Sequence, residues 1–379
     1  MGKTRITIID ETIREGMQHN GIVFTYPERE KILEFQERLG LDISQAGYPP
    51  AHSTEEDNLK KLCLSAEKKG YKIQVAGMGR AFMNDAEILV KTGTNHFHLH
   101  SHINSDEGKD CEEILSHVTE TIDFIRKEKT GAKISIAMLD IGRTDPRILE
   151  KFSYFLINKL KIDILSLPDT SGIMAPNFMY DKIHPIAVLA SKSKTQISIH
   201  CHNDMGMASA NTIMGIHAGA EILEASVLGI GERNGIADLF ITGKILKDQG
   251  FEMNLKTNET EIFRQYYAYV NEICSAQTGE TLLHVNTPFF GDAVKTHVAG
   301  THGATAFGVT ALDPARTCEQ KIFLNLLCGK HLVEKYLKTA GIEYNQEKIN
   351  TITANIKSES ANLKRRLTNK EIKCIAEQA

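Results

Sequence analysis

The sequence has no long uninterrupted apolar run and no strong excess of charge of either sign. It has 44 Lys and Arg residues against 48 Asp and Glu residues, which gives a formal net charge of −4. No apolar stretch is long enough to span a bilayer, and the nearly balanced charge disfavours a basic nucleic-acid-binding surface. We therefore expect neither a membrane protein nor a nucleic-acid-binding protein.

Cysteine pairs of the C-x-x-C kind are also absent. The seven cysteines are scattered along the chain, which is typical of reduced thiols in an intracellular protein. The N-terminus passes from Met1 directly into a strand-like segment, without the apolar region of a signal peptide. These absences together predict a cytoplasmic protein.

What the sequence does have is a regular alternation of short apolar runs and amphipathic segments. Runs rich in β-branched residues occur at 6–9, 41–46, 72–76, 96–102, 133–138, 162–167, 196–200 and 222–228. Helix-like segments alternate with them at 27–39, 54–69, 84–91, 110–129, 145–160, 177–191, 207–218 and 238–249. This repeated strand–helix pattern predicts a (β/α)8 TIM barrel. An open doubly wound sheet is the alternative, which the lack of G-x-G-x-x-G after the first run disfavours.

The alternation stops near residue 255. Two further helical patterns occur at 259–276 and 347–361. Between them lies a stretch at 284–308 that is rich in Gly, His and Thr, and loops of this composition often act as lids. We therefore expect a catalytic barrel over 1–255 and a helical C-terminal region over 256–379 that carries a lid-like loop.

Two histidines follow the seventh run, at the position where such barrels carry their active sites. His200 and His202 alternate around Cys201, and alternate side chains of a strand share one face. Two imidazoles on one face at a barrel mouth suit a divalent metal ion. The alternative is that hydrogen bonds within the fold satisfy both rings.

Acidic residues beside an arginine follow the first run, in the segment DETIREG (10–16). A carboxylate from this segment would complete a set of two histidines and one carboxylate with open metal positions. Arg14 would stabilise an oxyanion next to that ion. A capped turn with a surface ion pair is the alternative interpretation.

Three more strand ends carry polar groups. GRTD (142–145) and PDTSG (168–172) follow the fifth and sixth runs, and their arginine and hydroxyl groups would bind a carboxylate. Helix capping is the alternative use of Thr144 and Asp145. GIGERNG (229–235) follows the eighth run, where its glycines permit a close backbone approach and its Glu-Arg pair would brace metal ligands.

Taken together, these segments resemble one family. The motifs are DETIREGMQ (10–18), AGYP (46–49), GRTD (142–145), PDTSG (168–172), HCHND (200–204) and GIGERNG (229–235). In this order they resemble the 2-isopropylmalate, homocitrate and citramalate synthases, in the group that also includes 3-hydroxy-3-methylglutaryl-CoA lyase. The resemblance covers roughly residues 5–245, continues into THVAGTH (296–302), and is closest in motif to the homocitrate synthases.

The resemblance implies a role for each matching residue. Glu15, His200 and His202 would bind a divalent cation, which these ligand types allow to be Mg, Mn, Zn or Fe. The residues that would act in catalysis are Arg14, Glu232 and His302. The residues that would bind substrate are Gln18, His98, His100, Arg143, Thr144, Thr170 and His297.

The activity that the resemblance implies is a Claisen-type condensation of acetyl-CoA with a 2-oxo acid. The products would be CoA and a 2-hydroxy-2-(carboxymethyl) acid, with His302 as the base that deprotonates the acetyl methyl group. The loop at 284–308 would reach the active site of a partner subunit, so a homodimer is implied. Two other classes stay open, which are a carbon–carbon lyase acting on a 3-hydroxyacyl-CoA and a non-catalytic barrel subunit.

The sequence departs from the family's pattern around the second and fourth runs. Gln45 stands where relatives usually carry a glutamate, and the run at 96–102 places four histidines on one face of a strand. A tyrosine that relatives carry shortly after the histidine matching His302 is also missing. Because strand ends two to four would form the pocket for the acceptor's side chain, the sequence predicts a reaction class and leaves the acceptor open.

Overall fold

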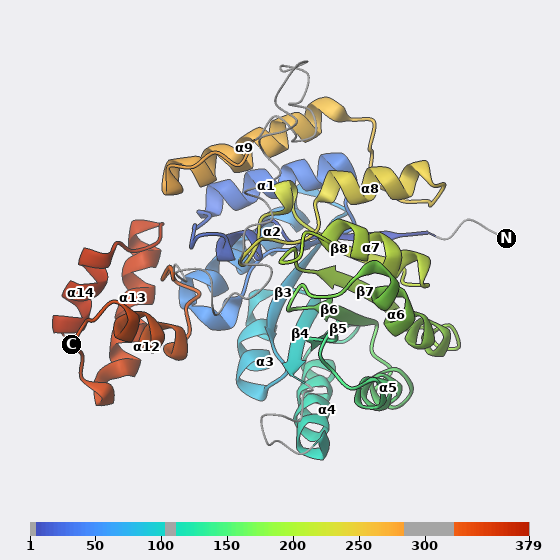
Figure 1. Ribbon diagram of the computed structural model, residues 1–379, viewed down its shortest axis with the longest axis horizontal. Helices are drawn as coiled ribbons and strands as arrows, with labels where there is room; N and C mark the ends of the chain where they lie inside the picture. Colours follow the sequence, from blue (N-terminus) through green and yellow to red (C-terminus); the bar gives the residue numbers. More distant parts are fainter. Residues whose placement is uncertain (1–4, 103–110, 284–321, 379) are drawn as a thin grey trace.

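The structure is a computed structural model that describes residues 5–102, 111–283 and 322–378. Its strands are parallel and close into a barrel in sequence order, with β1 pairing with both β2 and β8. Helices alternate with the strands and surround the barrel (Figure 1). The predicted (β/α)8 barrel is therefore confirmed.

The elements of the barrel follow the predicted alternation. The strands are Thr7–Asp10 (β1), Ile43–Gln45 (β2), Gln74–Arg80 (β3), His96–His102 (β4), Lys133–Leu139 (β5), Ile164–Asp169 (β6), Gln196–Cys201 (β7) and Ile222–Ala225 (β8). The helices are Tyr26–Leu39 (α1), Ser53–Lys69 (α2), Met83–Leu89 (α3), Cys111–Glu128 (α4), Pro146–Tyr154 (α5), Pro176–Ala190 (α6), Ala208–His217 (α7) and Leu239–Asp248 (α8).

Strand β3 runs four residues beyond the apolar run that predicts it. Gly77 and Gly79 interrupt the apolar pattern, yet their missing side chains are what the packing requires. A Cβ atom added at Gly77 would lie 2.6 Å from Leu59 Cδ2, and one added at Gly79 would lie 2.9 Å from Leu89 Cδ1. The glycines therefore let α2 and α3 pack closely against the outer face of the strand.

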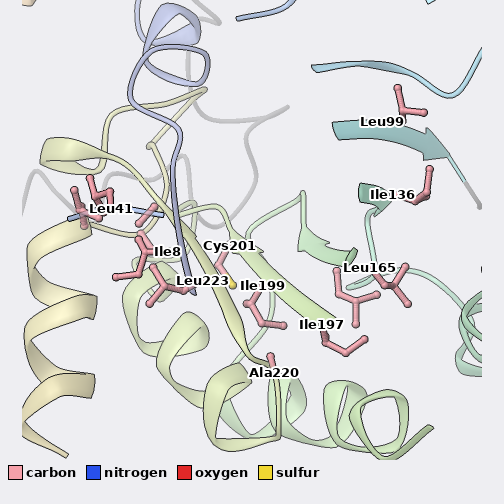
Figure 2. Packing of buried hydrophobic residues seen from close by; sticks show 14 of the residues in the cluster. Ile8, Leu41, Leu99, Ile136, Leu165, Ile197, Ile199, Cys201, Ala220 and Leu223 are labelled. Atoms are coloured by element: carbon pink, nitrogen blue, oxygen red, sulfur yellow. The ribbon is translucent and has the colours of Figure 1, made fainter. Parts of the chain in front are cut away.

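Outward-facing residues of the strands form the layer between the barrel and its helices. Ile8, Leu99, Ile136, Leu165 and Ile197 are all fully or almost fully buried in this layer, and Figure 2 labels them among the residues of the apolar cluster. Burial of such side chains stabilises each by about 1.5–3 kcal/mol relative to an exposed position. The strands therefore read as near-continuous apolar runs on this face.

The inward-facing residues change character along the barrel axis. An apolar cluster of Ile9, Ile43, Ala76, Ile164 and Ile222 fills the interior toward the amino ends of the strands. Positions two residues further along the same strands are polar on β1, β2, β6 and β8, because a strand alternates its faces with a period of two. The barrel therefore has a closed apolar floor and a polar mouth.

Helix α9 (Thr260–Thr278) belongs to the same apolar core as the barrel. Its Tyr266 stacks on Phe35 of α1 with ring centroids 5.3 Å apart, and Tyr266 Oη donates a hydrogen bond to Asp10 Oδ2 at 2.9 Å. Figure 1 shows α9 lying along α1. Helix α9 thus packs with the barrel, although it lies beyond residue 255, where the sequence predicts the boundary.

Three C-terminal helices form a second, smaller core. They are Lys330–Thr339 (α12), Ile349–Leu363 (α13) and Asn369–Gln378 (α14), and their buried side chains include Val333, Leu337 and Ile352. The sequence predicts α13 alone, because α12 and α14 are short and rich in charge, and α14 buries little beyond Ile372. Within the described residues, no helix combines the length and hydropathy needed to cross a membrane.

This C-terminal core contacts the loops at the barrel mouth. Asn325 Nδ2 donates to the carbonyl oxygen of Met17 at 2.9 Å, and Lys357 Nζ donates to the carbonyl oxygen of Ala51 at 2.7 Å. The C-terminal region thus adjoins the loops that follow β1 and β2. The predicted lid-like loop at 284–308, with His297 and His302, lies outside the described residues, and its role stays a prediction.

Candidate active site at the barrel mouth

The three predicted metal ligands lie together at the carboxyl ends of β1 and β7. The Nε2 atoms of His200 and His202 are 3.2 Å apart, with their rings at 67° to each other. Two nitrogen ligands about 2.1 Å from one ion and near a right angle to each other are separated by about 3 Å. The two buried rings therefore lie at hydrogen-bonding distance from each other, which is also the separation of two ligands of a shared ion.

Carboxylates lie beside these rings. Glu11, Glu15 and His200 each offer a ligand atom, and those atoms lie within 4.8 Å of one another in a buried cluster. Burial alone would raise the pKa of Glu15, but the Arg14 guanidinium and the two histidines lower it to about 2. Glu15 is therefore ionised, and the group as a whole has the donor atoms that a divalent cation takes.

The Nδ1 side of the His200 ring faces two carboxylates, those of Glu11 and Glu224. Its Nδ1 lies 2.8 Å from Glu11 Oε2 and 3.3 Å from Glu224 Oε2. Burial would lower the pKa of His200, but these two carboxylates raise it to about 10. Without an ion the ring is therefore protonated on both nitrogens, and a bound cation would displace the Nε2 proton while the carboxylates keep the one on Nδ1, which is the arrangement found behind metal-binding histidines.

Glu224 is itself held in place deep in the barrel. Its Oε1 accepts hydrogen bonds from Ser166 Oγ and Ser198 Oγ, each at 2.7 Å. These hydroxyls come from β6 and β7, so three strands fix one carboxylate. The fully buried charge is stabilised by these donors and by His200, since a buried carboxylate without partners would be protonated instead.

Arg14 reaches across the mouth between the metal cluster and β2. Its guanidinium contacts Glu15 and Gln45 Oε1, and it lies 3.1 Å from Glu11 Oε2 and 3.0 Å from Gln18 Oε1. Burial would lower the pKa of Arg14, and the neighbouring glutamates raise it, so it stays charged. A positive charge fixed by four partners beside the ion site suits the stabilisation of a developing oxyanion.

The loop after β8 closes the cluster from above. The Glu232 backbone N–H donates to Glu15 Oε1 at 3.0 Å, whereas the Glu232 side chain is half exposed. Arg233 binds Asp204 through two hydrogen bonds of 2.7 and 2.8 Å and donates to the Thr170 carbonyl oxygen at 2.6 Å. The Glu-Arg pair therefore braces the loops after β1, β6 and β7, and Glu232 acts on the site through its backbone.

The expected carboxylate-binding residues lie around Asp140, which follows β5 with a positive φ of 63°. Arg143 is 65% exposed and its Nε donates to Asp140 Oδ2 at 2.7 Å, while the Thr144 hydroxyl donates to the Asp140 carbonyl oxygen at 2.8 Å. Thr170 Oγ1 accepts the Asp140 backbone N–H at 2.9 Å and keeps its own proton to donate. The structure thus brings these residues together at the β5 and β6 ends.

The histidines of β4 point into the barrel at successive depths. His96 is buried lowest and contacts Ser135 Oγ through Nε2 at 2.7 Å, which makes it part of the packed interior. His100 lies at the mouth, where Nε2 is 3.4 Å from the Tyr48 hydroxyl. Burial lowers the pKa of His98, and burial together with nearby positive groups lowers that of His100 to about 3. Both rings are therefore neutral.

Sequence reasoning did not single out Glu224, Ser166 or Ser198. Each lies inside an apolar run rather than after one, so a search restricted to strand ends passes over them. The signal that would find them is the alternation of strand faces, since Glu224 stands two positions beyond the inward-facing Ile222.

Comparison with known proteins gives a consistent result. Residues 5–265 match the HMGL-like family. The chain is 31% identical to 2-isopropylmalate synthase of Sulfurisphaera tokodaii, over 94% of this chain and 92% of that protein. It is 27% identical to homocitrate synthase of Pyrococcus abyssi, over 88% of this chain and 90% of that one. Among solved structures, the HMG-CoA lyase of Bacillus subtilis has a TM-score of 0.62 at 18% identity and covers 77% of this chain and 100% of that one, which shows a shared fold.

Proposed function

The chain belongs to the HMGL-like family and has relatives among the acyl-CoA condensing synthases, and on this premise we propose that it condenses acetyl-CoA with a 2-oxo acid. Carbon–carbon bond formation gives a thioester, and its hydrolysis by water gives the products, which are CoA and a 2-hydroxy-2-(carboxymethyl) acid. The observation that carries this proposal is the buried cluster of Glu11, Glu15 and His200, with His202 in contact with His200 and the charge of Arg14 beside it.

Glu15, His200 and His202 are the residues that would hold a divalent cation. Their fit rests on the facing Nε2 atoms, on the ionised Glu15 and on the carboxylates behind His200. Such an ion, when bound, supplies Lewis-acid chemistry toward the carbonyl group of a 2-oxo acid. Glu11 and Glu224 keep the His200 ring in the orientation that this binding requires.

Arg14 meets the negative charge that grows on the 2-oxo oxygen during carbon–carbon bond formation. Its four contacts hold the guanidinium in place before the reaction, so little reorganisation is needed when the charge develops. Thr170, with a hydroxyl proton left to donate, and Arg143 are the groups at the β5 and β6 ends that would bind the substrate's carboxylate.

The remaining parts of the proposal concern the base and the assembly. His302 takes the proton from the acetyl methyl group, with His297 near the acyl-CoA, in a loop contributed by the partner of a homodimer in the cytoplasm. These assignments are supported by the family resemblance of THVAGTH (296–302). These assignments do not depend on the assignment of the metal ligands, so one set can be wrong while the other is right.

The direct test is release of CoA from acetyl-CoA by the metal-loaded enzyme across a panel of 2-oxo acids. We expect release that depends on both the 2-oxo acid and the divalent ion, and that falls to background with chelator. Cleavage of 3-hydroxyacyl-CoA esters without any 2-oxo acid would replace the proposal by the lyase. Absence of any bindable divalent ion would replace it by the non-catalytic barrel.

A further inference from the structure

Four buried nitrogen atoms on the β2–β4 side of the barrel interior have no hydrogen-bond partner among the described residues. Two lie deeper on β4, which are His96 Nδ1 and His98 Nδ1, and two lie at the mouth, which are Gln45 Nε2 and His100 Nδ1. Gln45 is fully buried, and a buried polar atom without a partner costs about 1–3 kcal/mol. Such atoms at a barrel mouth therefore point to a ligand group that pairs with them.

The two atoms at the mouth belong to one of its walls. Gln45 and His100 are inward-facing residues of β2 and β4, on either side of β3 in the barrel. Tyr48 follows β2 and reaches His100 on β4, with Oη 3.4 Å from Nε2. This contact crosses the end of β3 above Met78, which pairs with His98 in the strand register. We call Gln45, Tyr48, Met78 and His100 the acceptor wall.

The acceptor wall offers proton donors. Gln45 Oε1 faces the Arg14 guanidinium, which can only donate, so the free end of this amide is its NH2 group. His100 Nδ1 is a donor as well in the tautomer whose Nε2 accepts a proton from Tyr48, a hydroxyl that also contacts the Asp85 carboxylate. Burial raises the pKa of Tyr48, so its hydroxyl keeps that proton.

A carboxylate beside this wall, Asp85, interacts with Tyr48 and is neutralised by an arginine. Arg80 on β3 is paired with Asp85, with Nε and Nη2 at 3.0 and 2.7 Å from its carboxylate. Arg14 lies close enough to Tyr48 and His100 to influence the pKa of both. The wall is therefore lined by donors next to a positive charge, with the apolar Met78 between them.

We propose that the acceptor wall binds a carboxylate at the end of the acceptor's side chain, so that the acceptor is a 2-oxo dicarboxylic acid. An ionised carboxylate only accepts hydrogen bonds, so it can pair with both Gln45 Nε2 and His100 Nδ1. The methylene groups of such a substrate lie against Met78. A branched alkyl side chain would cover both donors without pairing them, and sites built to hydrogen-bond a substrate reject such analogues strongly. This inference rests on the proposed function.

The test compares acceptors in isosteric pairs, with CoA release by the metal-loaded enzyme as the readout. The pairs are oxaloacetate with 4-methyl-2-oxopentanoate, 2-oxoglutarate with 5-methyl-2-oxohexanoate, and 2-oxoadipate with 6-methyl-2-oxoheptanoate. For at least one chain length we expect kcat/KM at least roughly 100-fold higher for the dicarboxylic acid. Equal or higher kcat/KM for the branched alkyl member of every pair would overturn the inference.

Calorimetric binding of the same pairs separates this inference from the proposed function. If no acceptor releases CoA, the condensation is wrong, and the binding preference alone then decides the acceptor wall. Tighter binding of the dicarboxylic member supports the wall as proposed. Equal binding, or tighter binding of the alkyl member, contradicts it.

Two variants assign the effect to the wall. Gln45→Glu keeps the shape of the side chain and its contact with Arg14 while replacing the donor with an anion, and His100→Leu removes the other donor. For each variant we expect kcat/KM to fall roughly 10- to 100-fold for the dicarboxylic acid, mainly through KM, and by far less for its alkyl isostere. His217→Leu, at an exposed position of α7, is the matched control. Equal losses for both members of a pair would indicate a structural role and contradict the proposal.

Discussion

The two walls of the barrel mouth use polar groups in opposite ways. On the side of β1, β7 and β8, the charged groups lie in ion pairs with one another, from Arg14 and Glu15 to His200 and Glu224. On the side of β2 to β4, neutral donors such as Gln45 Nε2 have neither an ion pair nor a hydrogen bond among the described residues. The charges of the first wall are thus fixed before substrate binds, as catalysis requires, whereas we propose that the donors of the second wall are paired by the substrate, as selectivity requires.

Among changes to the two walls, loss of a metal ligand is expected to have the largest effect on activity. His202→Ala removes one of the two facing Nε2 atoms. We expect kcat/KM to fall roughly 1,000-fold or more with every acceptor, because an ion contributes several kcal/mol to stabilisation of the transition state. Metal content and steady-state kinetics measured on the same preparation check this. If the variant kept both its ion and its activity, the metal site would lie elsewhere in the protein.

Replacement of Arg14 is expected to have the next largest effect. Arg14→Met keeps much of the side-chain volume and removes the charge beside Glu15. We expect kcat to fall roughly 100- to 1,000-fold, as for loss of one oxyanion-stabilising donor, with bound metal retained. If kcat were unchanged and only KM rose, Arg14 would be a binding residue instead.

The carboxylate behind His200 is expected to tune the ion rather than bind it. Glu224→Gln keeps both serine contacts possible but removes the charge facing His200 Nδ1. We expect metal affinity to fall roughly 10- to 100-fold, measured by competition with a chelator, with activity restored at high metal concentration. Activity that stayed lost at saturating metal would show a more direct role for Glu224.

The smallest effect is expected from a single serine beneath Glu224. Ser166→Ala removes one of two equivalent hydrogen bonds to Oε1 and leaves Ser198 in place. We expect a loss of about 1 kcal/mol in the free energy of unfolding, measured by denaturant titration, and a few-fold weaker metal binding. A loss of metal affinity as large as that of Glu224→Gln would mean that the serines fix the carboxylate together.

The fold and the charged side of the barrel mouth could be predicted from the sequence. Strand–helix periodicity predicts the barrel, and the residues after each strand include Arg14, Glu15, His200 and His202, because parallel strands bring their carboxyl ends together. Glu224 was not singled out because it lies inside an apolar run, and its inward orientation follows from its pairing with the inward-facing Ile9.

Residues of the acceptor wall could be located in the sequence, but their role could not be predicted from it. Gln45 and the histidines of β4 stand out as departures from the family's pattern. Whether they pair with each other or with a substrate depends on distances across β3, such as that between Tyr48 and His100. Sequence patterns describe neighbours along one strand. The proposed selectivity for the 2-oxo acid depends instead on side chains from β2 and β4, which are not adjacent strands.

The central claim is that Glu15, His200 and His202 form the metal site of a condensing enzyme. Crystals grown with zinc and measured at its absorption edge test this claim most directly. We predict one anomalous peak about 2.1 Å from both Nε2 atoms and within ligand distance of Glu15, with Glu224 outside the coordination sphere. A peak held by Glu11 or Glu224 without His202, or no peak at the barrel mouth, would contradict it.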